Sequence, residues 1–142
     1  MRVELSTHIE APTSAVWIVL SDVAQWPTWS ESMERVRVDA TCRFGVGSKA
    51  RIKQPKLPES TWTVTRWDTG EGFDWESKAL GVTSIGTHEI ERDGSGSRVT
   101  LGFEQTGWLA PMMSLLIGKR ARRYVEMERD GLRRAAEAMR VD

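Results

Sequence analysis

Apolar and polar residues alternate along much of the chain, which predicts a protein built largely of β-strands. Residues 3–9 alternate as a half-buried strand does, and six further alternating segments follow between residues 36 and 103. Asp93-Gly94-Ser95-Gly96 is a strong hairpin signal between two of these segments. Because consecutive strands are joined by short turns, we expect an antiparallel meander.

Two short helices are predicted between the first strand and the rest. Pro12 suits the first turn of a helix, where its missing N–H costs little, and residues 15–20 are almost all apolar. Asp22 is a suitable N-cap for a second short helix, which we expect Pro27 to end.

From about Trp108 to the end, the apolar residues recur with the period of a helix. A helix of about 30 residues would be on the order of 45 Å long, enough to cross the whole sheet. With each residue advanced by about 100°, the charged residues gather on one arc and the apolar residues on the other. The apolar arc contains Met113, Ile117, Ala121, Tyr124, Val125, Leu132, Ala135 and Met139.

One carboxylate is out of place on this helix. Glu128 falls in the middle of the apolar arc, and Arg120 and Gly131 fall near its edge. A glutamate that faces a core is costly unless it is paired or hydrated. Either Glu128 lines a solvated cavity, or the end of the helix lifts off the sheet.

The bulk composition excludes several classes of protein. The 142 residues suit one domain, and 20 basic residues balance 20 acidic ones, so we expect no nucleic acid partner. Cys42 is the single cysteine, which rules out an intrachain disulfide and fits a reducing compartment. With no signal-peptide pattern at the start, we expect a soluble, cytoplasmic protein.

The segment Trp108–Gly118 is the longest apolar stretch, yet it is too short for a membrane span of about 20 residues. It is apolar on nearly all faces of the expected helix, so something must cover it. Four interpretations of this segment are left open. It is a mobile portal, a homodimer contact, a lip that touches a membrane transiently, or a segment that loops bury in a monomer.

The order of elements and several local motifs resemble one family. The segments Ile9-Glu10-Ala11-Pro12, Val16-Trp17, Leu20-Ser21-Asp22-Val23 and Trp26-Pro27-Thr28-Trp29-Ser30 resemble the opening of the polyketide cyclase/dehydratase-like proteins of the START (Bet v 1-like) superfamily. Gly45-Val46-Gly47 and His88-Glu89-Ile90 resemble its turn before the third strand and its sixth strand. The resemblance covers residues 1–142 and implies an α+β helix-grip fold, in which a curved antiparallel sheet wraps around the long C-terminal helix. It also implies a cavity between the two, usually for a hydrophobic ligand.

Aromatic side chains supply the candidate wall of such a cavity. The seven tryptophans outnumber the three phenylalanines and one tyrosine, and aromatic walls with few polar groups are typical of small-molecule pockets. Arg66 shares the parity of Trp62 and Val64 and is a candidate anchor for a ligand carboxylate, although a surface pair with Asp68 or Asp74 is favoured. The predicted ligand contacts are Trp62, Val64, Arg66, Phe73, Trp75, His88, Phe103, Met113, Ile117, Arg120, Tyr124 and Glu128.

Three residues are candidates for catalysis. His88 is an inward polar group that either bonds a ligand or moves a proton, or else is a satisfied core histidine. Glu128 is either a cavity carboxylate with a raised pKa or a glutamate that reaches solvent past the helix edge, and the second interpretation is slightly favoured. With His88, either Glu128 or Tyr124 would complete an acid–base pair for cyclisation or dehydration.

Binding or transport of a hydrophobic small molecule, such as a lipid or polyketide, is the leading functional hypothesis. A cyclase or dehydratase that uses the acid–base pair is the second, and an interaction module with a filled core is the third. One cysteine and two histidines offer no metal-binding spacing, and no phosphate loop or nucleophile motif occurs, so we expect no metal and no cofactor.

Overall fold

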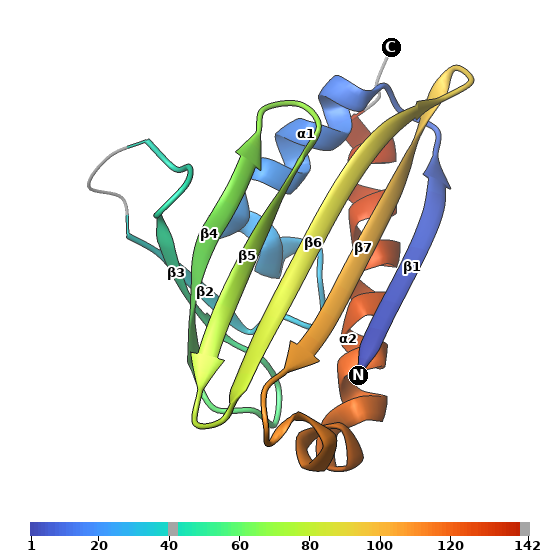
Figure 1. Cartoon of the computed structure of the whole chain (residues 1–142). Coiled ribbons are helices and arrows are strands. Elements are labelled where there is room, and N and C mark those ends of the chain that lie inside the picture. The colour runs from blue at the N-terminus through green and yellow to red at the C-terminus, as the bar shows by residue number, and fades with distance from the viewer. Residues whose placement is uncertain (40–42, 140–142) are drawn as a thin grey trace.

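The computed structural model describes residues 1–39 and 43–139, so Cys42 lies outside the described residues. A seven-stranded sheet forms one layer, and three helices lie against one of its faces (Figure 1). In chain order the elements are β1 (Arg2–Ile9), α1 (Thr13–Ser21), η1 (Val23–Thr28), β2 (Arg35–Val38), β3 (Lys49–Lys53), β4 (Ser60–Asp68), β5 (Gly72–Ala79), β6 (Val82–Asp93), β7 (Gly96–Thr106) and α2 (Ala110–Met139).

The sheet has the order β1-β7-β6-β5-β4-β3-β2, and every neighbouring pair is antiparallel. β2 to β7 form the expected meander because short turns join them. β1 closes the far edge by pairing with β7, with Val3 opposite Phe103 and Ile9 opposite Ser97. The predicted α+β helix-grip architecture is therefore confirmed.

A β-bulge in β4 changes which side chains face inward. The register with β5 shifts between Val64 and Arg66, so the extra residue reverses the parity of the strand beyond it. Before the bulge, Trp62 and Val64 are buried. Beyond it, Trp67 packs against the core, and Arg66 forms its contacts with charged residues outside the core.

The short helices differ in detail from the expectation. Pro12 precedes α1 as its N-cap residue, and Asp22 stands at the N-cap of η1 without a capping bond from its side chain. The second helix is a 3-10 helix that contains Pro27 and continues to Thr28, so the prediction that Pro27 ends it was wrong by one residue. Because this 3-10 helix is short, the missing N–H of Pro27 leaves few carbonyl oxygens without a hydrogen-bond partner.

The core lies between the inner face of the sheet and the helices. Trp26 of η1 is fully buried in it and donates its Nε1–H to the carbonyl oxygen of Leu20 at 2.9 Å. Its ring meets the rings of Trp29, Phe73 and Trp75 at centroid distances of 5.2–6.2 Å. The short helices are thus fixed to the sheet by aromatic packing.

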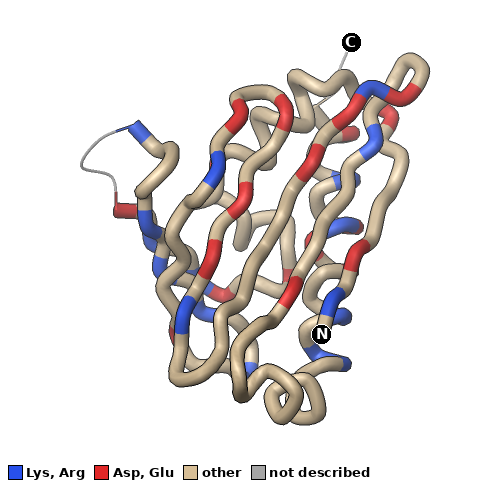
Figure 2. The backbone as a smooth tube through the Cα atoms, in the orientation of Figure 1, with Lys and Arg blue, Asp and Glu red and all other residues tan. Residues whose placement is uncertain are grey.

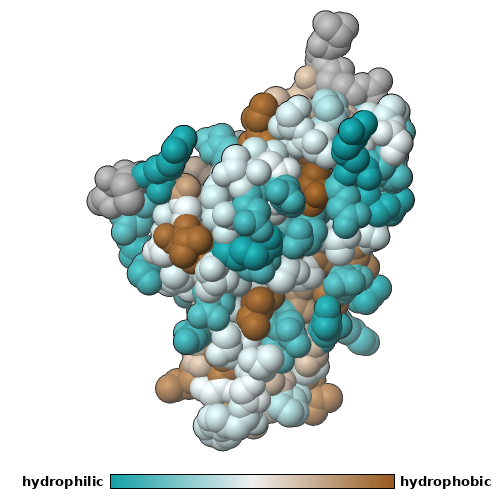
Figure 3. Space-filling view, turned by 45° about the horizontal axis from the view of Figure 1, so that its top comes forward, coloured by the Kyte–Doolittle hydropathy of each residue, from teal (hydrophilic) through white to brown (hydrophobic). Residues whose placement is uncertain are grey.

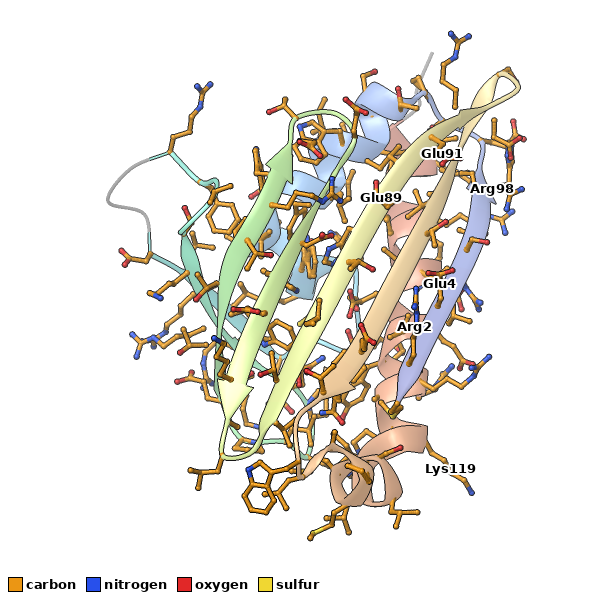
Figure 4. The ribbon with its side chains drawn as sticks, in the orientation of Figure 1. Arg2, Glu4, Glu89, Glu91, Arg98 and Lys119 are labelled. Carbon is orange, nitrogen blue, oxygen red and sulfur yellow. The ribbon has the colours of Figure 1, made fainter. Side chains whose placement is uncertain are left out.

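The outer face of the sheet is charged, as Figure 2 shows for the strands in front. Glu89 and Glu91 of β6 and Arg98 of β7 lie on it (Figure 4). No described helix combines the length and apolarity that a span across a lipid bilayer requires. The long helix α2 instead begins with an uncharged segment, at the lower end of Figures 1 and 2, and becomes charged further on.

Candidate functional site

A partly enclosed cavity lies between the inner face of the sheet and α2. The cavity has a volume of about 70 Å³. Most of the wall is apolar. The residues that border the cavity are Met33, Ile52, Gln54, Leu57, Trp62, Trp75, Gly86, Thr87, His88, Leu101, Gly102, Phe103, Ile117, Ala121, Tyr124, Val125 and Glu128.

His88 is the most deeply buried polar residue on the sheet side of the cavity wall. Its Nδ1 lies 3.0 Å from the carbonyl oxygen of Phe73, the residue opposite it on β5. A carbonyl oxygen only accepts, so Nδ1 donates and the neutral ring keeps a lone pair on Nε2. Burial lowers the pKa of His88 from 6.5 to about 4. The ring is therefore neutral at pH 7, and its Nε2 is a hydrogen-bond acceptor.

Aromatic rings hold the imidazole of His88 in place. Phe73 stacks on it with centroids 4.2 Å apart and planes 17° apart. Trp26 and Trp75 approach it edge-on at 5.4 and 5.7 Å. Three aromatic neighbours and one hydrogen bond leave the ring a single orientation, so its free acceptor is preorganised.

Glu128 of α2 is the polar residue on the opposite wall. It forms no hydrogen bond or ion pair with any residue of the described ranges. Burial alone raises its pKa from 4.5 to about 8. At pH 7 most molecules therefore carry a protonated carboxyl, which donates one hydrogen bond and accepts others.

Tyr124 also borders the cavity, but its hydroxyl group is already engaged. The hydroxyl donates to the carbonyl oxygen of Pro55 in the β3–β4 loop. Burial raises the pKa of Tyr124, and the nearby Arg120 partly offsets this rise. Tyr124 thus ties α2 to the loop, and Glu128 is the freer partner for His88.

The structure brings seven of the twelve predicted ligand contacts to one cavity. These are Trp62, Trp75, His88, Phe103, Ile117, Tyr124 and Glu128. His88 and Glu128 border the same cavity, which the acid–base hypothesis requires. Val64 and Phe73 are fully buried in the core behind the wall. Met113 and Arg120 are half-buried on α2 and do not border the cavity.

Arg66 does not border the cavity, because the bulge in β4 turns it outward; it forms the surface pairs with Asp74 and Asp68 that the sequence favoured over a ligand contact. Arg66 donates through Nε and Nη2 to the carboxylate of Asp74 at 3.0 and 3.2 Å. It also pairs with Asp68 and Glu89, so three carboxylates surround one guanidinium group. Arg66 is a structural cation of the outer sheet face.

Several wall residues carry no signal that sequence patterns detect. Gly86 and Gly102 border the cavity, and Trp75 packs beside Gly86, where a Cβ would lie 2.7 Å from the indole nitrogen. Met33 and Leu57 come from loops whose position depends on the tertiary fold. Ala121 and Val125 lie on the apolar arc that the helical period defined.

The wall therefore combines a neutral acid, a neutral acceptor and apolar surface. This set can bind a molecule that is mostly apolar and carries a polar group, or it can donate and accept a proton on one. Within residues 1–39 and 43–139, no cluster of three or more His, Cys, Asp or Glu side chains is arranged to hold a metal ion.

Comparison with protein families identifies the family of the chain. The model of the family "Polyketide cyclase / dehydrase and lipid transport" matches residues 1–137. The chain belongs to this family. No curated protein matches the chain.

Solved structures show the same fold at low sequence identity. The protein TTHA0849 from Thermus thermophilus is 20% identical with a TM-score of 0.78, and the match covers 99% of this chain and 100% of that one. Ara h 8.0201 is 9% identical with a TM-score of 0.64, over 93% and 97% of the two chains. The di-domain ARO/CYC protein StfQ, from the steffimycin biosynthetic pathway, is 13% identical with a TM-score of 0.71, over 96% of this chain and 49% of that one.

Proposed function

We propose that the protein binds a hydrophobic small molecule that carries at least one polar group, in the cavity between the sheet and α2. The unpaired carboxyl of Glu128 is the observation that carries this proposal. Glu128 is half-buried, and a carboxyl that is shielded from much of the solvent without a partner costs free energy, which a bound polar group would offset. The free acceptor of His88 on the opposite wall supports the same conclusion, as does the family's association with cyclisation and lipid transport.

The size of the cavity limits the ligand. A cavity of about 70 Å³ holds a few water molecules. A compact molecule of one or two rings suits this space, and a larger one requires α2 or the β3–β4 loop to move outward. Tyr124 joins these two elements through its bond to Pro55, so they would move together.

A titration with 2-naphthol, an apolar probe with one hydroxyl group, tests the proposal. We expect the indole N–H resonances of Trp62 and Trp75 to shift, because both rings border the cavity. Ala121→Phe fills the cavity from α2 and should abolish the shifts. Ala138→Phe is the matched control on the exposed side of the same helix and should preserve them. Shifts confined to the exposed Trp108 would contradict the proposal.

An acid–base enzyme is the second candidate, because one cavity holds Glu128, whose pKa is raised, opposite His88, whose pKa is lowered. At pH 7 the carboxyl of Glu128 is a neutral acid whose pKa of about 8 suits proton donation in enolisation and loss of water, and His88, with a pKa of about 4, is a hydrogen-bond acceptor and only a weak base. Conversion of a poly-β-ketone thioester, followed by mass spectrometry as loss of water, tests it. Glu128→Gln should lower the rate by about 100-fold or more. Binding of the thioester without turnover would favour a carrier protein over an enzyme.

The hypothesis of an interaction module requires a filled core. The cavity bordered by Glu128 and His88 argues against it, so we do not propose it. The exposed apolar surface that this hypothesis also requires is present, and it leads to a different conclusion.

A further inference from the structure

One end of the molecule carries an exposed apolar surface made by two segments distant in sequence. We call it the apolar end. Its residues are Leu80 in the β5–β6 turn and Trp108, Met112, Leu115 and Leu116 at the start of α2. Their exposed fractions are 91%, 80%, 56%, 89% and 69%, in that order. The first turns of α2 and the β5–β6 turn lie together at the lower end of Figure 1, and Figure 3 shows apolar side chains on both flanks of that end.

The apolar end is a built surface, because hydrogen bonds and close packing join its two segments. The backbone N–H of Leu109 donates to the carbonyl oxygen of Gly81 at 3.0 Å. Gly81 has a φ of +70°, and a Cβ there would lie 2.9 Å from the side chains of Trp108 and Leu109. The turn and the helix start thus fit closely only with glycine at this position.

The outward stripe of α2 changes from apolar to basic along the helix. Met112, Leu115, Leu116 and Lys119 are spaced by three, four and seven residues, so they form one continuous stripe. Arg122 and Arg123 continue it. An exposed apolar segment followed directly by cations can place apolar side chains in a bilayer while the cations meet anionic headgroups.

Unpaired cations flank the apolar end. Residues 105–118 contain no charged side chain, and Lys119 and Arg120 follow directly. Lys78, before Leu80 on the other segment, is paired with Glu76. Lys56 is exposed in the β3–β4 loop at the same end of the molecule, where Glu59 is paired with Arg35. Lys56, Lys119 and Arg120 form no ion pair within the described ranges, and Figure 4 shows Lys119 pointing away from the sheet. These cations match an anionic surface.

We infer that the apolar end docks the protein on an anionic lipid bilayer. The apolar side chains enter the boundary between headgroups and acyl chains, with the indole of Trp108 at the interface, and the cations contact lipid phosphates. Ile117 borders the cavity one residue after Leu116, so docking brings the cavity wall within one helical turn of the bilayer. The inference goes beyond ligand binding and does not depend on it.

Sedimentation with lipid vesicles tests the inference directly. Wild-type protein is mixed with vesicles of phosphatidylcholine and phosphatidylglycerol, and separately with phosphatidylcholine alone. We expect binding to the anionic vesicles, weaker binding to the neutral ones, and loss of binding at high salt. Leu115→Gln/Leu116→Gln should weaken binding by roughly tenfold or more. Lys119→Glu should weaken binding to the anionic vesicles alone.

The matched control changes two exposed apolar residues elsewhere. Ile18→Gln/Val46→Gln alters side chains that are 55% and 68% exposed and lie outside the apolar end, so it should bind vesicles as the wild type does. Absence of vesicle binding, or equal binding by both double variants, would overturn the inference. Concentration-dependent dimerisation that Leu115→Gln/Leu116→Gln abolishes, without vesicle binding, would assign the surface to a second copy and also overturn it. The 2-naphthol titration needs no lipid, so failure of the docking leaves the ligand-binding test unaffected.

Discussion

The Nδ1–H of His88 donates to the carbonyl oxygen of Phe73 at 3.0 Å, and the ring of Phe73 stacks on the imidazole at 4.2 Å. One residue thus sets both the tautomer and the plane of the histidine. The lone pair on Nε2 remains the free polar feature of a ring that borders the cavity. With the neutral carboxyl of Glu128, it gives the cavity one acceptor and one donor.

The buried carboxyl of Glu128 should make stability depend on pH. Its pKa of about 8 in the folded protein exceeds the ordinary 4.5, so the folded state binds more protons between these values. Its contribution to the free energy of unfolding is therefore complete below pH 4.5 and is lost as pH rises through 8. The loss should be on the order of a few kcal/mol.

Urea unfolding of wild type and Glu128→Gln at about pH 5, 7 and 9 measures this loss. The amide replaces the neutral carboxyl, so the variant should become the more stable protein as pH rises. Subtracting the stability curve of the variant from that of the wild type cancels the contributions of His8 and His88, which also titrate in or near this range. A difference that does not vary with pH would show that Glu128 is hydrated and ionised.

Trp26 should be among the most costly core residues to truncate. It is fully buried, touches four aromatic rings and donates to the carbonyl of Leu20. Trp26→Ala should lower the free energy of unfolding by about 3–5 kcal/mol. Trp108→Ala, at an exposed tryptophan, should change it by about 0.5 kcal/mol or less. Similar losses in chemical denaturation of both variants would contradict the packing described here.

Arg66 should matter for stability although it is not a ligand contact. Arg66→Met keeps the apolar stem but leaves Asp68, Asp74 and Glu89 close together without a cation. We expect a loss of about 1–2 kcal/mol that shrinks at high salt, because salt screens the repulsion. Arg2→Met, which breaks the exposed pair with Glu4, should cost little. A loss that salt does not alter would argue against repulsion as its cause.

His8 should titrate at a higher pH than an isolated histidine. Its two ring nitrogens lie 2.8 Å from Asp93 and 2.7 Å from Glu10, and the hydrogen bond to Asp93 contributes most to the rise of its pKa above 6.5. An NMR titration of wild type and Asp93→Asn measures the effect. The pKa of His8 should fall in the variant, and an unchanged value would disprove the interaction.

Much of the fold follows from two periodicities that the sequence displays. The period of two residues predicted the meander, and the period of a helix predicted α2, which runs for 30 residues from Ala110 to Met139. The helical period also assigned Ile117, Tyr124 and Glu128 to one arc, and all three border the cavity. Met113 shares that arc but lies one turn too early to reach the cavity.

Features that depend on a single irregularity escaped prediction. The bulge between Val64 and Arg66 adds one residue to β4, and no alternation pattern locates such an insertion. Every residue beyond it changes face, which moved Arg66 outward and Trp67 inward. Gly86 and Gly102 were missed for another reason, since a glycine has no side chain to signal its place in the wall.

Mass spectrometry of molecules extracted from the protein shows whether a ligand occupies the cavity between the sheet and α2. Wild type and Ala121→Phe are purified side by side from the native host and extracted with organic solvent. We expect one mostly apolar molecule with a polar group to accompany the wild type in near-stoichiometric amount and to be depleted in the variant. Recovery of no such molecule, or of equal amounts from both proteins, would contradict binding in the cavity between the sheet and α2.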